Sequence, residues 1–337
     1  MTTKKKAVFF SKPDSEHIEG VFGQGRFEQY AEVLELPRLF VHRDNLKEHR
    51  EYLKDVTVGV CTWGMPEFTA EEIREYLPSL ELLLYVAGSV HYFAHPFLNS
   101  GIRITTAGAI MNEPVAEFTL AAILHANKGT LLSIDLYRQK GWQESHDIPL
   151  YKFPGTYRTK VGILGAGRIG ALVIRMLKNH SVELLVFDPF LSEERAQEMG
   201  VKKAGLKEIF STCQTISNHL ADNPQTRGML DYELFSLMGD TAAFVNTGRG
   251  AQVVEADLVR AMQEKPLRHA ILDVTYPEPA DPIMLCQPNI FCTPHIAGSA
   301  REESYRLADG VLDIYKEFLA TGHLREEVTK DMLATMA

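Results

Sequence analysis

The 337-residue sequence lacks several features that would place it in a specialised class of protein. It has no apolar run long enough to span a bilayer, and its N-terminus has no apolar signal-peptide core. Its four cysteines, Cys61, Cys213, Cys286 and Cys292, show no C-x-x-C spacing of the kind found in metal sites. We therefore expect free thiols in a reducing compartment, no bound metal, and a cytoplasmic location.

Positive charge is also scarce, since 35 Lys and Arg face 44 Asp and Glu for a net charge of −9. Nucleic-acid binding needs clustered basic residues, and the small cluster Lys4-Lys5-Lys6 reads as a solvated terminus. We expect neither a nucleic-acid nor a membrane partner. The remaining composition, 45% hydrophobic and 23% charged, is ordinary for a soluble enzyme, and the length suits two domains.

The first hundred residues alternate between strand and helix patterns. Strands are predicted at Ala7–Phe10, Val56–Cys61, Leu82–Ala87 and Ile102–Thr106, and amphipathic helices near 26–34, 45–53 and 70–77. A longer helix is predicted over Pro114–Asn127, with Pro114 in its first turn. This alternation predicts a parallel sheet with helices on its faces.

A second alternating series begins at Val161, after a predicted loop over 141–157. Its later strands are predicted at Val182–Phe187, Thr215–His219, Ala242–Asn246, Ala270–Val274 and Ile290–Cys292, and a helix over 300–321 closes the chain. Two crossings, near 108–113 and 296–299, would make a natural hinge. We expect an α/β protein in which a domain of residues 1–109 and 298–337 is interrupted by a domain of residues 110–297.

The second series opens with the most informative motif of the chain. Strand-like residues lead into Gly165-Ala166-Gly167-Arg168-Ile169-Gly170, the G-x-G-x-x-G spacing of a dinucleotide-binding turn. The following strand ends in Asp188, where a carboxylate can accept hydrogen bonds from an adenosine ribose. Because a carboxylate would repel a 2′-phosphate, we expect NAD rather than NADP. The alternative reading of Asp188 is a turn acid before Pro189.

Three residues that could carry the chemistry follow later predicted strands. Arg249 lies between two glycines, and its guanidinium fork suits the oxygens of a 2-oxo acid. Glu278 and His295 would form an acid–base pair, since a carboxylate can fix the tautomer of an imidazole. Sequence spacing alone does not show that the two touch, and each residue by itself could be an ordinary surface residue.

Four ordered segments give the chain a more specific resemblance. They are Val115-Ala116-Glu117, Gly165–Gly170 with Asp188, Val245–Gly250, and Leu272–Glu278 followed by Thr293-Pro294-His295. In these segments the chain resembles the D-isomer-specific 2-hydroxyacid dehydrogenases. The resemblance implies two Rossmann-like or flavodoxin-like domains with an active site in the cleft between them, and a homodimer joined through the long early helix and the loop after it.

The same resemblance implies roles for individual residues. Arg249 would bind the substrate's carboxylate and oxo group, His295 would be the acid or base, and Glu278 would orient His295. Thr247, Gly248 and Asp273 would lie against the cofactor, and the backbone of Val86, Ala87 and Gly88 would meet the substrate carboxylate. The implied reaction is NAD-dependent hydride transfer between a D-2-hydroxy acid and the corresponding 2-oxo acid.

Three positions depart from the family pattern. Gly248 replaces a small residue with a Cβ, the segment Asn218-His219-Leu220-Ala221 lacks the proline usually found just after its histidine, and an acid is missing after Gly88. Glu278 argues against the related formate dehydrogenases, which pair their histidine with a glutamine. An NAD(H)-sensing interaction protein of the corepressor type remains an alternative, and the side chain of the substrate stays open, from glyoxylate to a sugar acid.

Overall fold

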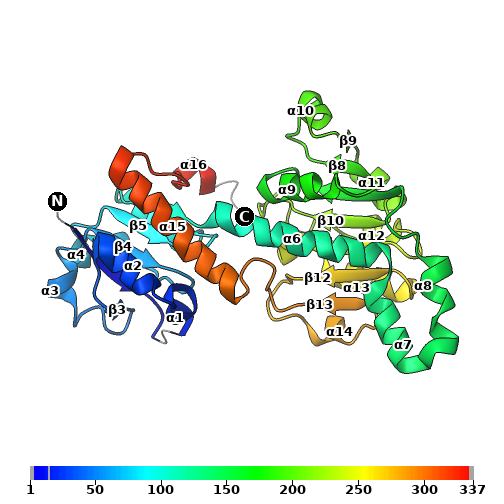
Figure 1. The fold of residues 1–337 in the computed structure, drawn as a ribbon, viewed down its shortest axis with the longest axis horizontal. Coiled ribbons are helices and arrows are strands. Elements are labelled where there is room, and N and C mark those ends of the chain that lie inside the picture. The colour runs from blue at the N-terminus through cyan, green and yellow to red at the C-terminus, as the bar shows by residue number, and fades with distance from the viewer. Residues whose placement is uncertain (1–3, 14–15, 334–337) are drawn as a thin grey trace. The chain divides into compact units, whose positions relative to one another are not determined.

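The computed structural model describes residues 4–13 and 16–333, and its contacts divide the chain into two compact units (Figure 1). Unit 1 lies within residues 1–111 and 299–336, and unit 2 within residues 112–298. Each unit is built around its own parallel sheet. Within the described ranges, no helix combines the length and the apolar character needed to cross a membrane.

The described part of unit 1 contains a sheet ordered β2-β1-β4-β5-β6, with β3 also paired to β1 and every pairing parallel. Its strands are β1 (Lys5–Phe10), β2 (Leu34–Glu35), β3 (Phe40–Val41), β4 (Val58–Cys61), β5 (Leu82–Tyr85) and β6 (Arg103–Thr106). The four strands predicted from the sequence are β1, β4, β5 and β6. The other two strands are two residues long, too short to give a periodic pattern.

Helices cover both faces of this sheet, because successive strand residues point to opposite sides. Val8 and Phe10 pack on one face with α3, α4 and α5, whereas Ala7 and Phe9 pack on the other with α1, α2 and α15. The helices are α1 (Glu16–Phe22), α2 (Arg26–Val33), α3 (Arg50–Leu53), α4 (Ala70–Tyr76), α5 (Ala94–Asn99), α15 (Arg301–Thr321) and α16 (Lys330–Leu333).

The helix predicted over 45–53 is wrong in its first half, because α3 begins only at Arg50. The side chain of Asn45 accepts a hydrogen bond from the amide of His42 at 2.9 Å and donates one to the carbonyl of Phe40 at 2.9 Å. An asparagine that bonds to the preceding backbone in this way stabilises a turn rather than a helix.

In the described residues, the sheet of unit 2 has the order β13-β12-β11-β10-β7-β8-β9, with all pairings parallel. The strands are β7 (Thr159–Leu164), β8 (Val182–Phe187), β9 (Lys202–Lys203), β10 (Thr215–Asn218), β11 (Ala243–Asn246), β12 (His269–Leu272) and β13 (Ile290–Cys292). Counted from β9, this is the doubly wound order 3-2-1-4-5-6 with one further strand. In such sheets ligands bind outside the carboxyl ends of the strands where the order reverses, here between β7 and β10.

Two predictions about the helices of this region are wrong. Helix α6 begins at Gly108, so Pro114 lies inside it rather than in its first turn. The predicted loop over 141–157 is helical as far as Lys152, and Gly141, at φ 71°, makes the bend that separates two helical stretches. The helices are α6 (Gly108–Asn127), α7 (Thr130–Ser145), α8 (Asp147–Lys152), α9 (Arg168–Leu177), α10 (Glu193–Glu198), α11 (Leu206–Thr212), α12 (Tyr232–Ser236), the 3₁₀ turn η1 (Gly250–Gln252), α13 (Glu255–Glu264) and α14 (Pro282–Leu285).

Separate apolar cores lie on the two faces of this second sheet. Val161 and Ile163 of β7 pack with α6, α9 and α10, while Leu164 and Phe244 pack with α11, α12 and α13. Helices therefore cover both faces of the sheet, and a ligand can approach it at the carboxyl ends of the strands.

Candidate functional site

The glycine turn after β7 has the geometry that its sequence predicts. Gly165 has φ 90°, and a Cβ on it would lie 2.7 Å from the carbonyl oxygen of His219. A Cβ on Gly170 would lie 2.0 Å from the carbonyl oxygen of Gly165. Both positions therefore require glycine, the first for its backbone conformation and the second for the close packing of α9 on the turn.

The N-terminus of α9 leaves room for a phosphate group. Its N-cap residue, Gly167, makes no capping side-chain hydrogen bond, and a Cβ on Gly167 would have no described protein atom within 4 Å. The first amides of a helix lack intrahelical acceptors and attract anions, and here Arg168 and Ile169 open the helix beside Ala166. The chain's own residues thus fit the pyrophosphate of a dinucleotide.

Asp188 lies at the end of β8, next to this turn. Its Oδ2 accepts a hydrogen bond from the amide of Ala166 at 2.7 Å, and its Oδ1 accepts one from the amide of Phe190 at 2.8 Å. Asp188 therefore contacts the glycine turn, and its contact with a ribose stays a prediction. Asp188 is also a turn acid before Pro189, because its bond with the Phe190 amide is the turn bond of an aspartate before a proline.

Arg249 extends from a tight turn after β11. A Cβ on the next residue, Gly250, would lie 2.1 Å from the carbonyl carbon of Thr275, so the turn closes against the loop after β12. The guanidinium is partly buried, and its Nη1 donates to the carbonyl oxygen of Gly248 at 2.7 Å. Burial lowers the pKa of Arg249, while the carboxylates of Asp222 and Glu278 act in the opposite direction. A guanidinium is a fork of hydrogen-bond donors that can bind a small carboxylate.

Glu278 and His295 form a direct pair, which the sequence could only suggest. The His295 Nδ1 lies 3.0 Å from Oε1 and 3.2 Å from Oε2 of Glu278. Both side chains are about half exposed, at 53% for His295 and 46% for Glu278. His295 has a φ of 55°, unusual for a residue with a side chain, and its amide donates to the carbonyl of Thr293 at 3.0 Å. The loop thus presents the ring to solvent while Nδ1 faces the carboxylate.

Asp273 is buried, and the hydrogen bonds of its carboxylate hold the His295 loop. Its Oδ1 accepts from the amide of Ile296 at 2.8 Å and the hydroxyl of Thr293 at 2.6 Å, and its Oδ2 accepts from the amide of Ala297 at 3.0 Å. These contacts fix the backbone on both sides of His295. A contact of Asp273 with the cofactor stays a prediction.

Thr247 and Gly248 lie in the turn before Arg249 and are fixed by neighbouring side chains. The Thr247 hydroxyl shares a hydrogen bond of 2.8 Å with the hydroxyl of Thr119 on α6, and the Gly248 amide donates to the Oδ1 of Asn246 at 3.0 Å. Thr119 could not be identified from the sequence, because it lies within an apolar helix pattern.

The turn after β5 belongs to unit 1 and is described within that unit. Val86 and Ala87 are fully buried, and the carbonyl of Val86 accepts a hydrogen bond from the Thr62 hydroxyl at 2.8 Å. Among the described residues, no backbone acceptor bonds to the amide of Ala87 or Gly88. Free amides at a strand end can bind an anion, so the backbone of this turn is suited to a substrate carboxylate. The contact itself stays a prediction.

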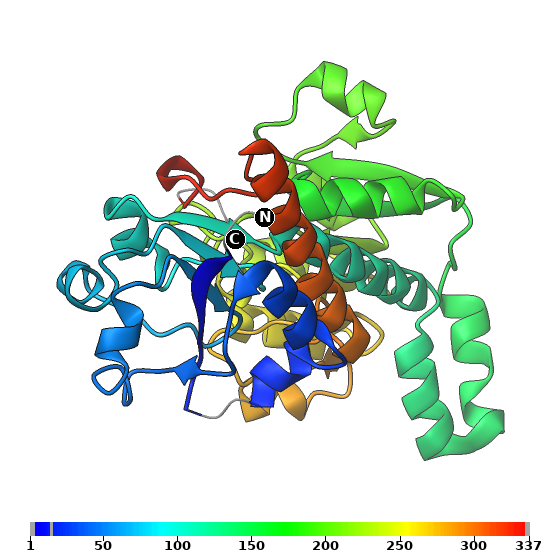
Figure 2. The ribbon, with the colours of Figure 1, turned by 60° about the vertical axis from the view of Figure 1, so that its left-hand side comes forward.

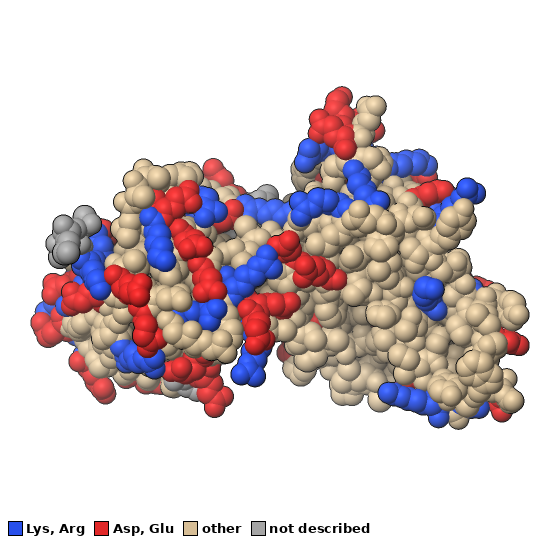
Figure 3. Space-filling view, in the orientation of Figure 1, with Lys and Arg blue, Asp and Glu red and all other residues tan. Residues whose placement is uncertain are grey.

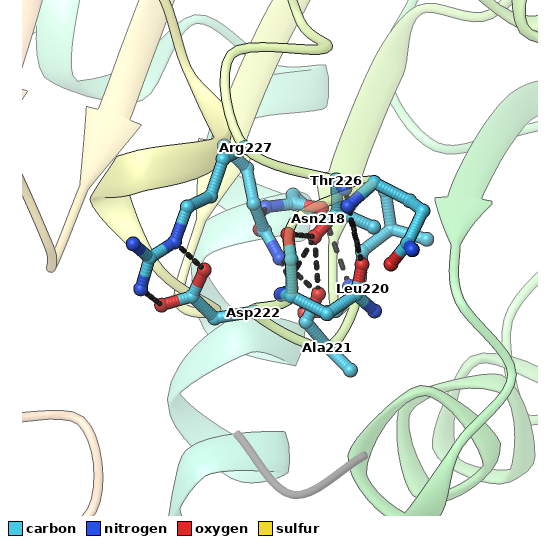
Figure 4. Close-up of polar contacts among 9 residues, drawn as sticks. Asn218, Leu220, Ala221, Asp222, Thr226 and Arg227 are labelled. Atoms are coloured by element: carbon cyan, nitrogen blue, oxygen red, sulfur yellow. Dashed lines mark hydrogen bonds and ion pairs between the residues drawn. The ribbon is translucent and has the colours of Figure 1, made fainter. Parts of the chain in front are cut away.

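Sequence reasoning missed a polar network around the loop after β10. Figure 4 shows Asp222 and Arg227 of this loop joined by two bonds, of 2.9 and 3.1 Å, between the guanidinium and both carboxylate oxygens. The Thr226 hydroxyl donates to the carbonyl of Ala221 at 2.6 Å in the same view. These contacts fix the loop at the position where the family proline is missing. No group of metal-ligating side chains occurs within the described ranges.

Comparisons with known proteins show which family the chain resembles most clearly. Residues 120–297 match a family model described as D-isomer specific 2-hydroxyacid dehydrogenase, NAD binding domain. A glyoxylate reductase of Korarchaeum cryptofilum (strain OPF8) is 28% identical over 246 residues, which are 72% of this chain and 74% of the relative. YoaD of Bacillus subtilis (strain 168) is 31% identical over 195 residues, and the chain spans about half of its length, 56%.

Solved structures share the fold over nearly the whole chain. The apo form of the D-mandelate dehydrogenase of Rhodotorula graminis superposes with a TM-score of 0.81 and covers 97% of this chain and 98% of its own. The sequence identity of 17% means that this likeness shows a common fold alone.

Proposed function

Because the chain belongs to the D-isomer specific 2-hydroxyacid dehydrogenase family, we propose that it interconverts a D-2-hydroxy acid and the 2-oxo acid with NAD as the hydride carrier. The observation that carries this proposal is the contact of 3.0 Å between His295 and Glu278. It lies in the same unit, at the same ends of the strands, as the glycine turn and Arg249. A dinucleotide site, a fixed cation and an acid–base pair are the parts that this reaction needs.

The pair can exchange one proton with the substrate at a defined atom. Glu278 accepts from Nδ1 of His295, so in the neutral ring the proton stays on Nδ1 and Nε2 is the base. During oxidation, Nε2 takes the hydroxyl proton as the C2–H bond breaks and the C=O bond forms. A bound nicotinamide would supply the acceptor for the hydride, and the Glu278 carboxylate stabilises the imidazolium left on His295.

Arg249 would bind the substrate's carboxylate and oxo oxygen. Its guanidinium stays charged at neutral pH and offers donors in a fork that matches two oxygens. The bond from Nη1 to the Gly248 carbonyl leaves the other donors of the fork for the substrate. Reduction reverses the sequence, with protonated His295 giving its proton to the oxo oxygen.

The preference for NAD over NADP rests on Asp188. Its carboxylate already lies at the glycine turn, 2.7 Å from the Ala166 amide, where a ribose hydroxyl could replace a backbone donor. A 2′-phosphate would bring a second negative charge to the same place. We expect NADH to be the better reductant.

Self-association is proposed through α6 and the helices that follow it. Exposed apolar side chains gather in residues 130–157, namely Ile134, Tyr137, Trp142, Leu150, Tyr151 and Tyr157. Figure 2 shows α7 and α8 extending from the rest of unit 2, and Figure 3 shows few charged side chains over α6 and α7. Such a patch on a soluble protein typically marks an interface, and a two-fold homodimer is the commonest form.

Sedimentation would test the homodimer. The wild type should sediment as a dimer at micromolar concentration, and Trp142→Glu should shift it toward the monomer. Phe190→Glu, at an exposed apolar residue outside the patch, should leave the dimer intact. A monomeric wild type would remove this part of the proposal.

A reduction screen tests the activity itself. Glyoxylate, hydroxypyruvate, longer 2-oxo acids and sugar-derived 2-oxo acids are mixed with NADH or NADPH, and nicotinamide absorbance is followed. We expect turnover with at least one 2-oxo acid, faster with NADH, and a D-2-hydroxy acid as product. A protein that binds NADH but reduces none of them would point to a sensing role instead.

A further inference from the structure

Three buried amide side chains surround the turn that carries Arg249, and the proposed chemistry leaves them without a role. Asn218 ends β10, Asn246 ends β11 and Gln252 ends η1, and none is more than 1% exposed. We propose that this amide cluster positions Arg249 for the carboxylate of a 2-oxo acid, an inference that rests on the proposed function.

Asn246 makes the direct contacts with the Arg249 turn. Its Oδ1 accepts a hydrogen bond from the amide of Gly248 at 3.0 Å, and its Nδ2 donates to the carbonyl of Arg249 at 3.1 Å. These two backbone groups lie on either side of the Arg249 Cα. Asn246 therefore fixes the direction in which the guanidinium leaves the chain.

Asn218 and Gln252 hold Asn246 in this orientation. The Asn218 Nδ2 donates to Asn246 Oδ1 at 3.1 Å and also to Gln252 Oε1, so both of its N–H groups are used. The Gln252 Nε2 donates to the carbonyls of Leu220 and Ala221, at 2.7 and 2.9 Å. Figure 4 shows the part of this network around Asn218. Turning either amide over would bring oxygen against oxygen, so the buried network admits one arrangement.

The network ends on the loop after β10, which is itself anchored. The bidentate Asp222–Arg227 pair and the bond of 3.3 Å from the Leu220 amide to Asn218 Oδ1 hold that loop. The same strand-end segment packs on the glycine turn, because a Cβ on Gly165 would meet the carbonyl of His219. The amide cluster thus ties the Arg249 turn to the wall of the nucleotide site.

Asn246→Ala tests the proposal, because it removes both contacts with the Arg249 turn and leaves the Gln252 bonds to the loop intact. We expect the KM for the 2-oxo acid to rise about tenfold or more, since a misplaced guanidinium weakens carboxylate binding in the ground state and transition state alike. The Kd for NADH should change less than about threefold, as measured by nucleotide fluorescence. A purely structural role would instead lower the Tm and leave KM unchanged.

Asn246→Asp is the second variant, because it nearly keeps the size of the side chain. It keeps the acceptor for Gly248 and Asn218 but sets a carboxylate oxygen against the Arg249 carbonyl oxygen. We expect KM to rise at least as much as for Asn246→Ala. In an Arg249→Lys background, Asn246→Ala should add little, because the positioned guanidinium is already gone.

Gln214→Ala is the matched control. Gln214 precedes β10 and donates from Nε2 to the carbonyl of Thr241 at 2.6 Å, so it joins the same two strands at their other ends. We expect its KM and kcat to equal those of the wild type. An equal rise in KM for the control would overturn the proposal.

Hydrogen exchange of the Gly248 amide supplies a readout that needs no turnover. It should exchange faster in Asn246→Ala than in the wild type or Gln214→Ala, with the protein alone in solution. Unchanged Gly248 exchange together with an unchanged KM would overturn the positioning role. A wild type that reduces no 2-oxo acid would contradict the proposed function, and Gly248 exchange alone would then decide whether the amide cluster holds the turn.

Discussion

The two sheets share a parallel doubly wound architecture but differ in what their strand ends present. In unit 1, the turn after β5 buries Val86 and Ala87 and continues with Gly88, so it can act through backbone groups alone. In unit 2, the loops after β11, β12 and β13 carry Arg249, Glu278 and His295. Both sheets therefore have a similar edge of strand ends, and the residues of the loops determine the chemistry at that edge.

The two units also differ in their histidines. Unit 2 buries His269 at 1% exposure in the amino end of β12, and burial lowers its pKa to about 4. None of the histidine side chains described in unit 1 is buried. We therefore expect acid to act first on unit 2.

His295→Ala gives the strongest test of the chemistry assigned to the loops of unit 2. Removing the proton donor should lower kcat by roughly 10²–10⁴, because positioned proton transfer contributes that much. NADH binding should persist, since the glycine turn and Asp188 are untouched. His180→Ala, in the turn before β8, is the control and should keep full turnover. Equal loss of NADH binding and turnover would count against the acid–base role.

Acid unfolding tests the difference in histidine burial between the two units. The pKa of His269 is about 4 when folded and about 6.5 when unfolded, so the unfolded chain binds more protons between these values. Its contribution is fully present above pH 6.5 and is lost as pH falls through 4, by roughly 3 kcal/mol in all. His269→Gln should flatten the fall of the unfolding free energy over this range, and His180→Gln should not. An unchanged slope in His269→Gln would contradict the assignment.

Asp188→Ser tests the nucleotide preference with a smaller expected effect. Loss of the carboxylate should shift the ratio of kcat/KM for NADPH over NADH upward by about tenfold, because one repulsive charge near the 2′-phosphate is removed. Asp55→Ser, at an exposed acid of unit 1, should leave the ratio unchanged. If the wild type already prefers NADPH, the role given to Asp188 is wrong.

The smallest effect is expected for alanine substitutions at two glycines that lie at helix N-termini, one of which is the control for the other. Gly167 is the N-cap residue of α9 and Gly205 is that of α11. Both have negative φ, and a Cβ on either would meet no described atom within 4 Å. Neither alanine variant should lose more than about 0.5 kcal/mol of stability. Gly167→Ala should weaken NADH binding several-fold by crowding the pyrophosphate, and Gly205→Ala should not. Equal affinities in a fluorescence titration would remove Gly167 from the nucleotide site.

Long, periodic features of the sequence were sufficient to predict much of the fold. The strands of both sheets longer than two residues lie within two residues of their predicted positions, because buried parallel strands are continuous apolar runs. The helical character of 141–152 was missed because Gly141 and Pro149 suggest a loop. The glycine turn was predictable, since φ 90° at Gly165 and close packing at Gly170 demand glycine, whereas the contact of Asp188 with the Ala166 amide was not predicted.

Side-chain contacts across the sheet were less accessible to sequence reasoning. The Glu278–His295 pair joins loops from different strands, and spacing does not fix such a distance. Asn246 lies within the segment Val245–Gly250, but nothing in the sequence links it to Asn218 and Gln252, because an amide at a strand end looks like an ordinary turn residue. Asp273 was assigned to the cofactor from a resemblance, whereas its visible contacts are with the backbone around His295.

The most direct test of the acid–base pair is the single-turnover rate at which a 2-oxo acid oxidises NADH bound to Glu278→Gln. The amide keeps the size of the side chain but cannot stabilise an imidazolium by charge. We expect that rate to fall at least about tenfold while the Kd for NADH stays at the wild-type value. An unchanged rate would mean that the carboxylate beside His295 takes no part in the proton transfer, and would contradict the assignment of the pair.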